Sequence, residues 1–338
     1  MAASGEGPMN HPENILEPDG DVVIILGKTA NGPLGKISFQ VSSKHMKQVS
    51  PVFRAMLSGT FKPGVKLGSK GCLRVPLPED EPEAFGMLLR VSYGQTGWIP
   101  KKLDIDILVD MAMLIDKYQF NNVMSYFSAS WFSRYKSSLL FTPDIEELMG
   151  FNPAYETVLD SSMTDLYQWL FVAYYFGLKK EFARAAGLLV RQSCERISDN
   201  EAADLLPIPV ETLDKLEDFR LDILSSMTIK LQTIMLECQP QNFSEHLSKA
   251  SRNVLRAIGG EESDPDRPFC GISFHQIVGF LNEVHAVRCN QPKLLENPET
   301  NMQAGELPKR MKLALSMTQH EILHLKIDDF MLGDEDGK

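Results

Sequence analysis

The chain has 338 residues, 43% hydrophobic and 23% charged, which is typical of a folded soluble protein and too long for a single small core. Its 34 Lys and Arg against 45 Asp and Glu give a net charge of −11 with no basic stripe, which argues against nucleic acid or anionic membrane as a direct partner. The longest apolar run, WLFVAYYFGL at 169–178, is too short for a bilayer. We therefore expect no transmembrane helix, and we expect no signal peptide at 1–10, which lacks a basic start and an apolar core.

Cysteine usage indicates a reducing compartment. The five cysteines are odd in number, widely spaced and without a C-x-x-C pair, which does not fit a disulfide framework. We expect a cytoplasmic or nuclear protein. The cysteines are Cys72, Cys194, Cys238, Cys270 and Cys289.

The N-terminal part predicts three strands after a tail. Residues 1–18 are rich in Gly, Pro, Asn and Glu and predict a disordered tail, with structure beginning near Asp19. The β-branched run DVVIIL at 21–26 and the alternating KISFQV at 36–41 flank a turn-rich segment and predict a strand pair. CLRVPL at 72–77 predicts a third, short strand.

Helices are predicted between and after these strands. The segment SSKHMKQVSPVFRAMLSG at 42–59 has helical composition, but Pro51 splits it, and Ser50 caps a new helix in which Pro51 is the first residue. A second start signal precedes a helix that begins near Pro82. The segment 103–120 carries an apolar stripe at spacings of three and four and predicts an amphipathic helix.

The residues from Asp21 to about Phe127 resemble a BTB/POZ domain, most like those of filamentous fungi with a helical C-terminal half. The matches are DVVIIL, Phe39, SPVFRAML, Phe61, VPLPEDEPEAFGMLLRVSYG and LVDMAMLIDKYQF. Animal members of the family usually carry His and Arg just after the second strand, where this chain has Ser42 and Ser43. The charged pocket that those residues build with the acid of the first strand, matched here by Asp21, is therefore incomplete.

The resemblance implies an α+β domain, a short mixed sheet capped by helices, followed by an all-α C-terminal region. Helical patterns continue after residue 121 without strands or a repeat. We predict four regions: a disordered tail at 1–18, the BTB/POZ domain at 19–130, a helical region at 131–260, and C-terminal helices with an acidic tail at 261–338.

The resemblance also implies a non-enzymatic interaction module that needs no cofactor. Family members form homodimers and dock cullin-type ubiquitin ligase scaffolds, and both options stay open. A role at DNA would have to come through a partner. We predict association through His45, Gln48, Val49 and Arg54. The loop residues Glu79, Asp80 and Glu81 either form a scaffold-contacting edge or stabilise the positive N-terminus of the helix that follows them.

A zinc metallohydrolase is the main alternative. His320, Glu321 and His324 spell H-E-x-x-H, in which two histidines one helical turn apart hold zinc and the glutamate activates water. A third ligand is missing at the expected spacing, where Phe330 stands in place of histidine. We therefore favour a surface helix here over a catalytic centre.

Three further patterns of the sequence suggest a site. Cys270, His275, His285 and Cys289 could hold structural zinc only if the predicted helix between the histidines breaks, because it would separate them by about 15 Å. Gly27, followed by Lys28 and Thr29, imitates a phosphate loop but lacks the glycine that should precede it. An aromatic group fits either a partner-binding face or internal packing: Tyr126, Phe127, Trp131, Phe132 and Tyr135.

Overall fold

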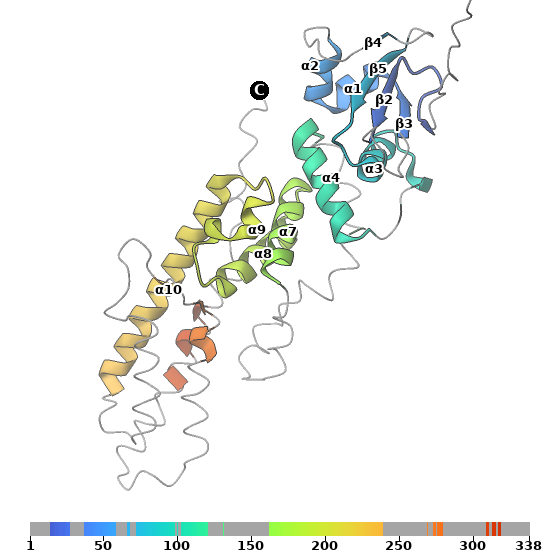
Figure 1. Ribbon diagram of the computed structural model, residues 1–338. Helices are drawn as coiled ribbons and strands as arrows, with labels where there is room; N and C mark the ends of the chain where they lie inside the picture. Colours follow the sequence, from blue (N-terminus) through green and yellow to red (C-terminus); the bar gives the residue numbers. More distant parts are fainter. Residues whose placement is uncertain are drawn as a thin grey trace, which may run out of the picture. The chain divides into compact units, whose positions relative to one another are not determined.

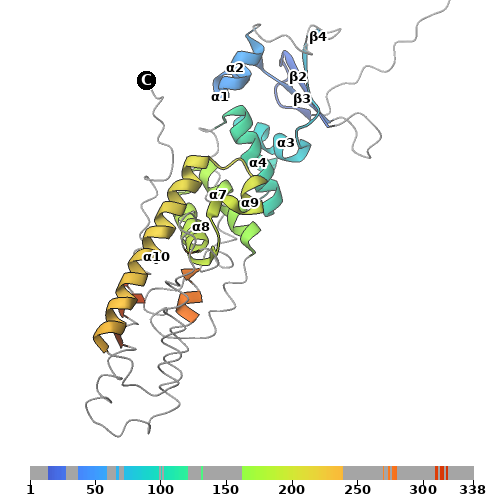
Figure 2. The same cartoon turned by 60° about the vertical axis from the view of Figure 1, so that its left-hand side comes forward.

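The protein forms two compact units in a computed structural model (Figures 1 and 2). The first comprises residues 1–134 with 175–178, and the second comprises 135–174 with 179–338. The division lies close to the predicted boundary after residue 130, and the predicted region 261–338 groups with the helices before it. The structure describes 14–27, 37–58, 66–67, 72–98, 100, 103–120, 131 and 162–238, and from there 269, 273–274, 276–279, 309–310, 313–315 and 317–318.

A mixed five-stranded sheet forms the centre of the first unit. Strand β2 (Val22–Leu26) lies in the middle, antiparallel to β3 (Ile37–Val41) and parallel to β5 (Leu73–Leu77). The short strands β1 (Asn14–Ile15) and β4 (Lys66–Leu67) form the two edges, in the order β1-β3-β2-β5-β4. The three predicted strands are confirmed. All of β2 except Ile25 is buried, which explains its nearly continuous apolar run.

The prediction of a disordered tail over 1–18 is wrong for its last residues. Asn14 and Ile15 form β1, which runs parallel to β3, and Leu16 is buried. The side-chain amide of Gln40 on β3 donates hydrogen bonds to the carbonyl oxygens of Pro18 and Gly20. The order of this segment therefore comes from pairing with β3 and not from its own apolar pattern.

A helical hairpin follows β3, and it turns where the sequence predicts. Helix α1 (Ser43–Val49) ends at Ser50, and α2 (Pro51–Leu57) begins at Pro51 with Ser50 as its N-cap. The Ser50 Oγ accepts a hydrogen bond from the Phe53 N–H at 3.0 Å and donates one to the carbonyl of Tyr118. This buried hydroxyl therefore starts α2 and also ties it to the end of α4 (Ile105–Tyr118).

We expect Ser50→Ala to lower the free energy of unfolding of the full chain by about 2–3 kcal/mol. The substitution removes a helix cap and leaves the Phe53 N–H and the Tyr118 carbonyl without this partner. Urea unfolding followed by circular dichroism measures the loss. Ser58→Ala is the matched control, because the exposed Ser58 hydroxyl only donates to the Arg54 carbonyl. Equal losses in the two variants would contradict this role for Ser50.

Two longer helices complete the first unit. Helix α3 (Pro82–Ser92) and the 3₁₀ turn η1 (Thr96–Trp98) precede α4, which packs against α3 and α2. A Cβ at Gly86 would lie 2.7 Å from the ring of Phe39, so glycine lets that ring lie against α3. The core between the helices is aromatic and brings together Phe53, Phe85, Tyr118 and Phe120.

The second unit is helical throughout its described part, as the sequence predicts. Helix α10 lies beside α8, and η4 contacts both α9 and α10. None of the helices in the described ranges is long and apolar enough to cross a membrane. The elements are α7 (Met163–Tyr175), α8 (Lys179–Gln192), η4 (Ile197–Asp199), α9 (Glu201–Asp204) and α10 (Val210–Cys238).

Candidate protein interaction surface

The α1–α2 hairpin holds the four residues predicted for association. Gln48 is exposed and Val49 is half-buried. The Nε2 of His45 lies 3.0 Å from the carbonyl oxygen of Ser92, and its ring lies 4.2 Å from that of Tyr93. The Arg54 Nε donates to the carbonyl of Lys47. His45 therefore connects the hairpin to the end of α3, and Arg54 connects α2 to α1.

The hairpin presents apolar side chains that its own fold buries only in part. Met46 and Phe53 point into the core, where both are fully buried. Val49, Val52, Met56 and Leu57 are half-buried, and Pro51 and Ala55 are exposed. We call the group Val49, Val52, Met56 and Leu57 the hairpin face. Where such residues form a contiguous apolar patch, the patch is a candidate surface for another protein to cover.

A polar corner fixes the start of α1. The carboxylate of Asp21 accepts hydrogen bonds from the Ser43 N–H at 2.7 Å and the Ser43 hydroxyl at 2.6 Å. The Ser42 N–H donates to the hydroxyl oxygen of Tyr93 at 2.7 Å. The Asp21 carboxylate, next to β2, thus fixes the first residue of α1. Ser42 and Ser43 stand where the resemblance leads one to expect basic residues. Tyr93 is not among the residues predicted for this site.

This corner lowers the pKa of Asp21 below its usual range. Slight burial of the carboxylate works in the opposite direction, but the hydrogen bonds from Ser43 and the positive charge of Lys47 outweigh it. The ionised carboxylate therefore stabilises the fold at pH values above the pKa that Asp21 has in the unfolded chain. This contribution is lost as the pH falls through the folded pKa.

We expect Ser43→Ala to raise the pKa of Asp21 toward its usual value, because the variant keeps only the backbone donor. A ¹³C NMR titration of the Asp21 carboxyl carbon measures the change. Ser42→Ala is the neighbouring control, since the Ser42 hydroxyl accepts from the His45 N–H and does not touch Asp21. A carboxyl that titrates at the same pH in both variants would contradict this account of the corner.

The acidic loop before α3 is only partly a surface edge. Asp80 is buried, with its carboxylate bound to the Lys117 ammonium and the Tyr118 hydroxyl. Its predicted role in contacting a partner is therefore wrong, because core groups occupy its oxygens. Glu81 caps α3 by accepting from the Ala84 N–H at 2.7 Å, which agrees with the prediction that the loop stabilises this helix. Glu79 and Glu81 are exposed.

Glu81 also belongs to a wider acidic edge. Partial burial, together with the charges of Glu81 and Asp106, raises the pKa of Asp110 above its usual range. The negative charges of Glu81, at the start of α3, and Asp106, in the first turn of α4, therefore both act on Asp110.

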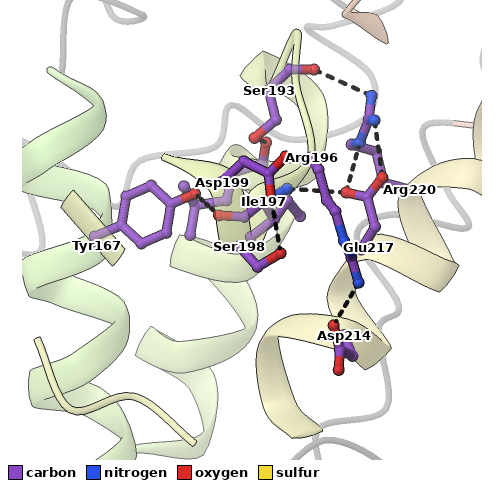
Figure 3. Close-up of polar contacts among 10 residues, drawn as sticks. Tyr167, Ser193, Arg196, Ile197, Ser198, Asp199, Asp214, Glu217 and Arg220 are labelled. Carbon is purple, nitrogen blue, oxygen red and sulfur yellow. Dashed lines mark hydrogen bonds and ion pairs between the residues drawn. The ribbon is translucent and has the colours of Figure 1, made fainter. Parts of the chain in front are cut away.

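A second polar cluster lies inside the helical unit (Figure 3). The Arg220 guanidinium forms two hydrogen bonds with the Glu217 carboxylate, at 2.9 and 3.0 Å, and both residues are buried. Glu217 also accepts from the Ile197 N–H, and the Tyr167 hydroxyl donates to the Ile197 carbonyl at 2.6 Å. Burial and the nearby carboxylates raise the pKa of Tyr167. The cluster thus pins η4 between α7 and α10.

Two further arginines of the helical unit differ in their surroundings. Arg196 and Asp214 form an ion pair at 3.0 Å on the surface (Figure 3). Arg191, in the last turn of α8, is buried, and its Nε is the one buried side-chain polar atom without a hydrogen-bond partner in the part of the chain described. Burial lowers the pKa of Arg191. The polar groups of the cluster around Glu217 form hydrogen bonds with one another, so we interpret the cluster as structural.

Several predicted sites lie wholly or partly outside the described residues. The H-E-x-x-H residues His320, Glu321 and His324 are among them, as are Cys270, His275, His285 and Cys289, together with Lys28 and Thr29. Of the aromatic group, Trp131 is described: it is buried, and its Nε1 donates to the Pro100 carbonyl, which favours packing for this residue. Within the described ranges, no three His, Cys, Asp or Glu side chains gather so as to hold a metal ion.

The comparisons with known proteins give no match. No protein-family model, no curated protein and no solved structure matches this chain. The candidate surface therefore stands on its own geometry.

Proposed function

We propose that the first unit is a BTB/POZ-type protein–protein interaction module that self-associates, or docks an adaptor, through the α1–α2 hairpin. The observation that carries the proposal is the hairpin face, four half-buried apolar residues on two short helices that the rest of the described unit leaves accessible. The residues that carry the family resemblance form β2, β3, α2, β5, α3 and α4 in the expected order, which supports the same proposal.

The hairpin face and the exposed carboxylates of the first unit suit two different kinds of contact. Burial of the hairpin face against a second copy would remove apolar side chains from water on both copies, which is how symmetric dimers gain most of their stability. The exposed carboxylates Glu79, Glu81 and Asp106 offer a charged edge for a scaffold protein, for which a cullin-type ubiquitin ligase is the candidate that the resemblance implies. The module itself carries out no reaction, and the helical unit recognises a further protein.

We also propose a cytoplasmic or nuclear location, based on the cysteines. Cys72 and Cys194 are both unpaired thiols. Free thiols support a reducing environment, the cytoplasm or the nucleus.

Val52→Asp tests the self-association. We expect it to weaken dimer formation of the full chain at least tenfold, because the new carboxylate would have to be buried between two apolar hairpins. Sedimentation velocity over a concentration series measures the dissociation constant. Met113→Asp is the matched control, since it places the same charge at an exposed apolar position of α4. A wild-type chain that stays monomeric, or a Val52→Asp chain that dimerises as tightly as wild type, would contradict self-association through the hairpin.

A further inference from the structure

An exposed tryptophan lies on the first unit, away from the hairpin. Trp98 in η1 is 72% exposed, whereas the other two tryptophans of the chain, Trp131 and Trp169, are each 1% exposed. Tryptophan is rarely left this exposed, because burying its ring removes a large apolar area from water. When it is exposed, it is among the residues that contribute most to protein–protein binding.

Trp98 is part of an ordered group. The Arg90 guanidinium carbon lies 5.2 Å from the centre of the Trp98 ring. The Nη2 of Arg90 donates to the Asn14 Oδ1 at 3.0 Å, which links η1 and α3 to the edge strand β1. The next residue of β1, Ile15, is 56% exposed. We call Asn14, Ile15, Arg90 and Trp98 the Trp98 patch.

The one charged side chain of the patch, that of Arg90, is positive, and Glu17 lies two residues beyond Ile15. No Asp or Glu occurs in the sequence from 84 to 103, where the charged residues are Arg90, Lys101 and Lys102, although the whole chain carries a net charge of −11. Among the ion pairs of the described residues, none involves Arg90. Its guanidinium has five N–H donors, and Asn14 accepts from Nη2 alone. Donors therefore remain for a carboxylate from another molecule.

We propose that the Trp98 patch docks an acidic segment of a partner protein that carries a large apolar side chain. The apolar side chain packs on the exposed Trp98 ring, and a neighbouring carboxylate binds the guanidinium of Arg90. Arginine stacked on an aromatic ring keeps its edge N–H groups free for this contact. The inference does not rest on self-association, because β1, α3 and η1 form the patch while α1 and α2 form the hairpin face.

The chain offers a direct reporter of this binding. Since Trp131 and Trp169 are buried, quenching of tryptophan fluorescence by acrylamide in the full chain reports mainly on Trp98. The probe is an eight-residue peptide with Leu-Phe at its centre and three Asp or Glu residues on each side. A second peptide with Asn and Gln in place of the acids has the same apolar centre without the charge.

We expect the acidic peptide to reduce acrylamide quenching at least twofold at saturation, and its affinity to fall as salt rises from 50 to 500 mM. Arg90→Gln should weaken binding about tenfold, whereas Arg184→Gln, which removes an exposed arginine of α8, should leave it unchanged. In Trp98→Phe the protection should vanish. The melting temperature of each variant shows that it is folded.

Three results would overturn the proposal. The first is quenching that the acidic peptide does not change at millimolar concentration. The second is equal protection by the uncharged peptide. The third is protection of Trp98 that rises with protein concentration in step with dimer formation, since it would assign the patch to a second copy of the chain.

Discussion

Glu217→Ala is expected to lower the free energy of unfolding of the helical unit by about 3–5 kcal/mol. The substitution leaves the buried Arg220 guanidinium with only the Ser193 carbonyl, at 3.4 Å, and it removes the acceptor of the Ile197 N–H. An uncompensated buried charge is among the most costly single defects in a protein. Urea unfolding measures the loss, and hydrogen exchange of peptides from α8 and α10 assigns it to this unit.

The surface ion pair in the same neighbourhood is the control for Glu217. Arg196 and Asp214 are joined at a similar distance, but both side chains are about half exposed. Solvent screens such a pair, so Asp214→Ala should cost less than about 1 kcal/mol. Equal losses in Asp214→Ala and Glu217→Ala would contradict the view that burial makes the difference.

A double variant separates the charge from the packing. Glu217→Leu combined with Arg220→Met removes both buried charges and keeps apolar volume in the same place. Since replacing a whole buried ion pair often costs little, we expect the double variant to be clearly more stable than Glu217→Ala. A double variant as unstable as the single one would show that the Ile197 N–H contact outweighs the charge.

Asp80→Ala is expected to lower the free energy of unfolding by about 2–3 kcal/mol. It removes the acceptor of the buried Tyr118 hydroxyl, whose ring belongs to the aromatic core of the first unit. Burial and the carboxylate of Asp80 raise the pKa of Tyr118 above its usual range. Urea unfolding of the full chain gives the change.

The other groups of this network predict a graded series. Lys117→Ala should cost less than Asp80→Ala, because the lysine side chain is half exposed and the buried Asp80 carboxylate keeps the Tyr118 hydroxyl as a donor. Tyr118→Phe removes the hydroxyl alone, and its effect should not add to that of Asp80→Ala, since both break the same hydrogen bond. An Asp80→Ala chain as stable as wild type would contradict this role of Asp80 in the core.

The sequence predicts best those elements whose signals are local. The corner at Ser50 and Pro51 combines a cap with a proline that fixes the first helical turn, and the structure places both as expected. The helix predicted over 103–120 follows from regular apolar spacing. The central strand β2 follows from an apolar run too short for most helices.

Long-range pairing explains most of what the sequence does not reveal. The edge strand β1 has two residues, too few for an alternation, and it is ordered through β3 and the side chain of Gln40. Glu217 and Arg220 are three residues apart on α10, and this spacing is common in solvent-exposed ion pairs. In the fold, η4 packs against α10, and the Ile197 N–H donates to Glu217.

The same limit applies to the candidate surfaces. Asp80 stands between two exposed glutamates in the acidic loop, and nothing local distinguishes it from them until Tyr118 and Lys117 approach across 38 and 37 residues. Trp98 lies in a segment where the apolar pattern gives no sign that its ring stays exposed. For such residues the environment depends on the fold as a whole.

Hydrogen exchange of the wild-type full chain at two protein concentrations tests the central claim most directly, because it locates the surface that a second copy covers. The account predicts that raising the concentration slows exchange in peptides from Ser43 to Leu57, the α1–α2 hairpin, and leaves peptides from α8 and α10 unchanged. Exchange that is the same at both concentrations, or that slows only outside the hairpin, would contradict it.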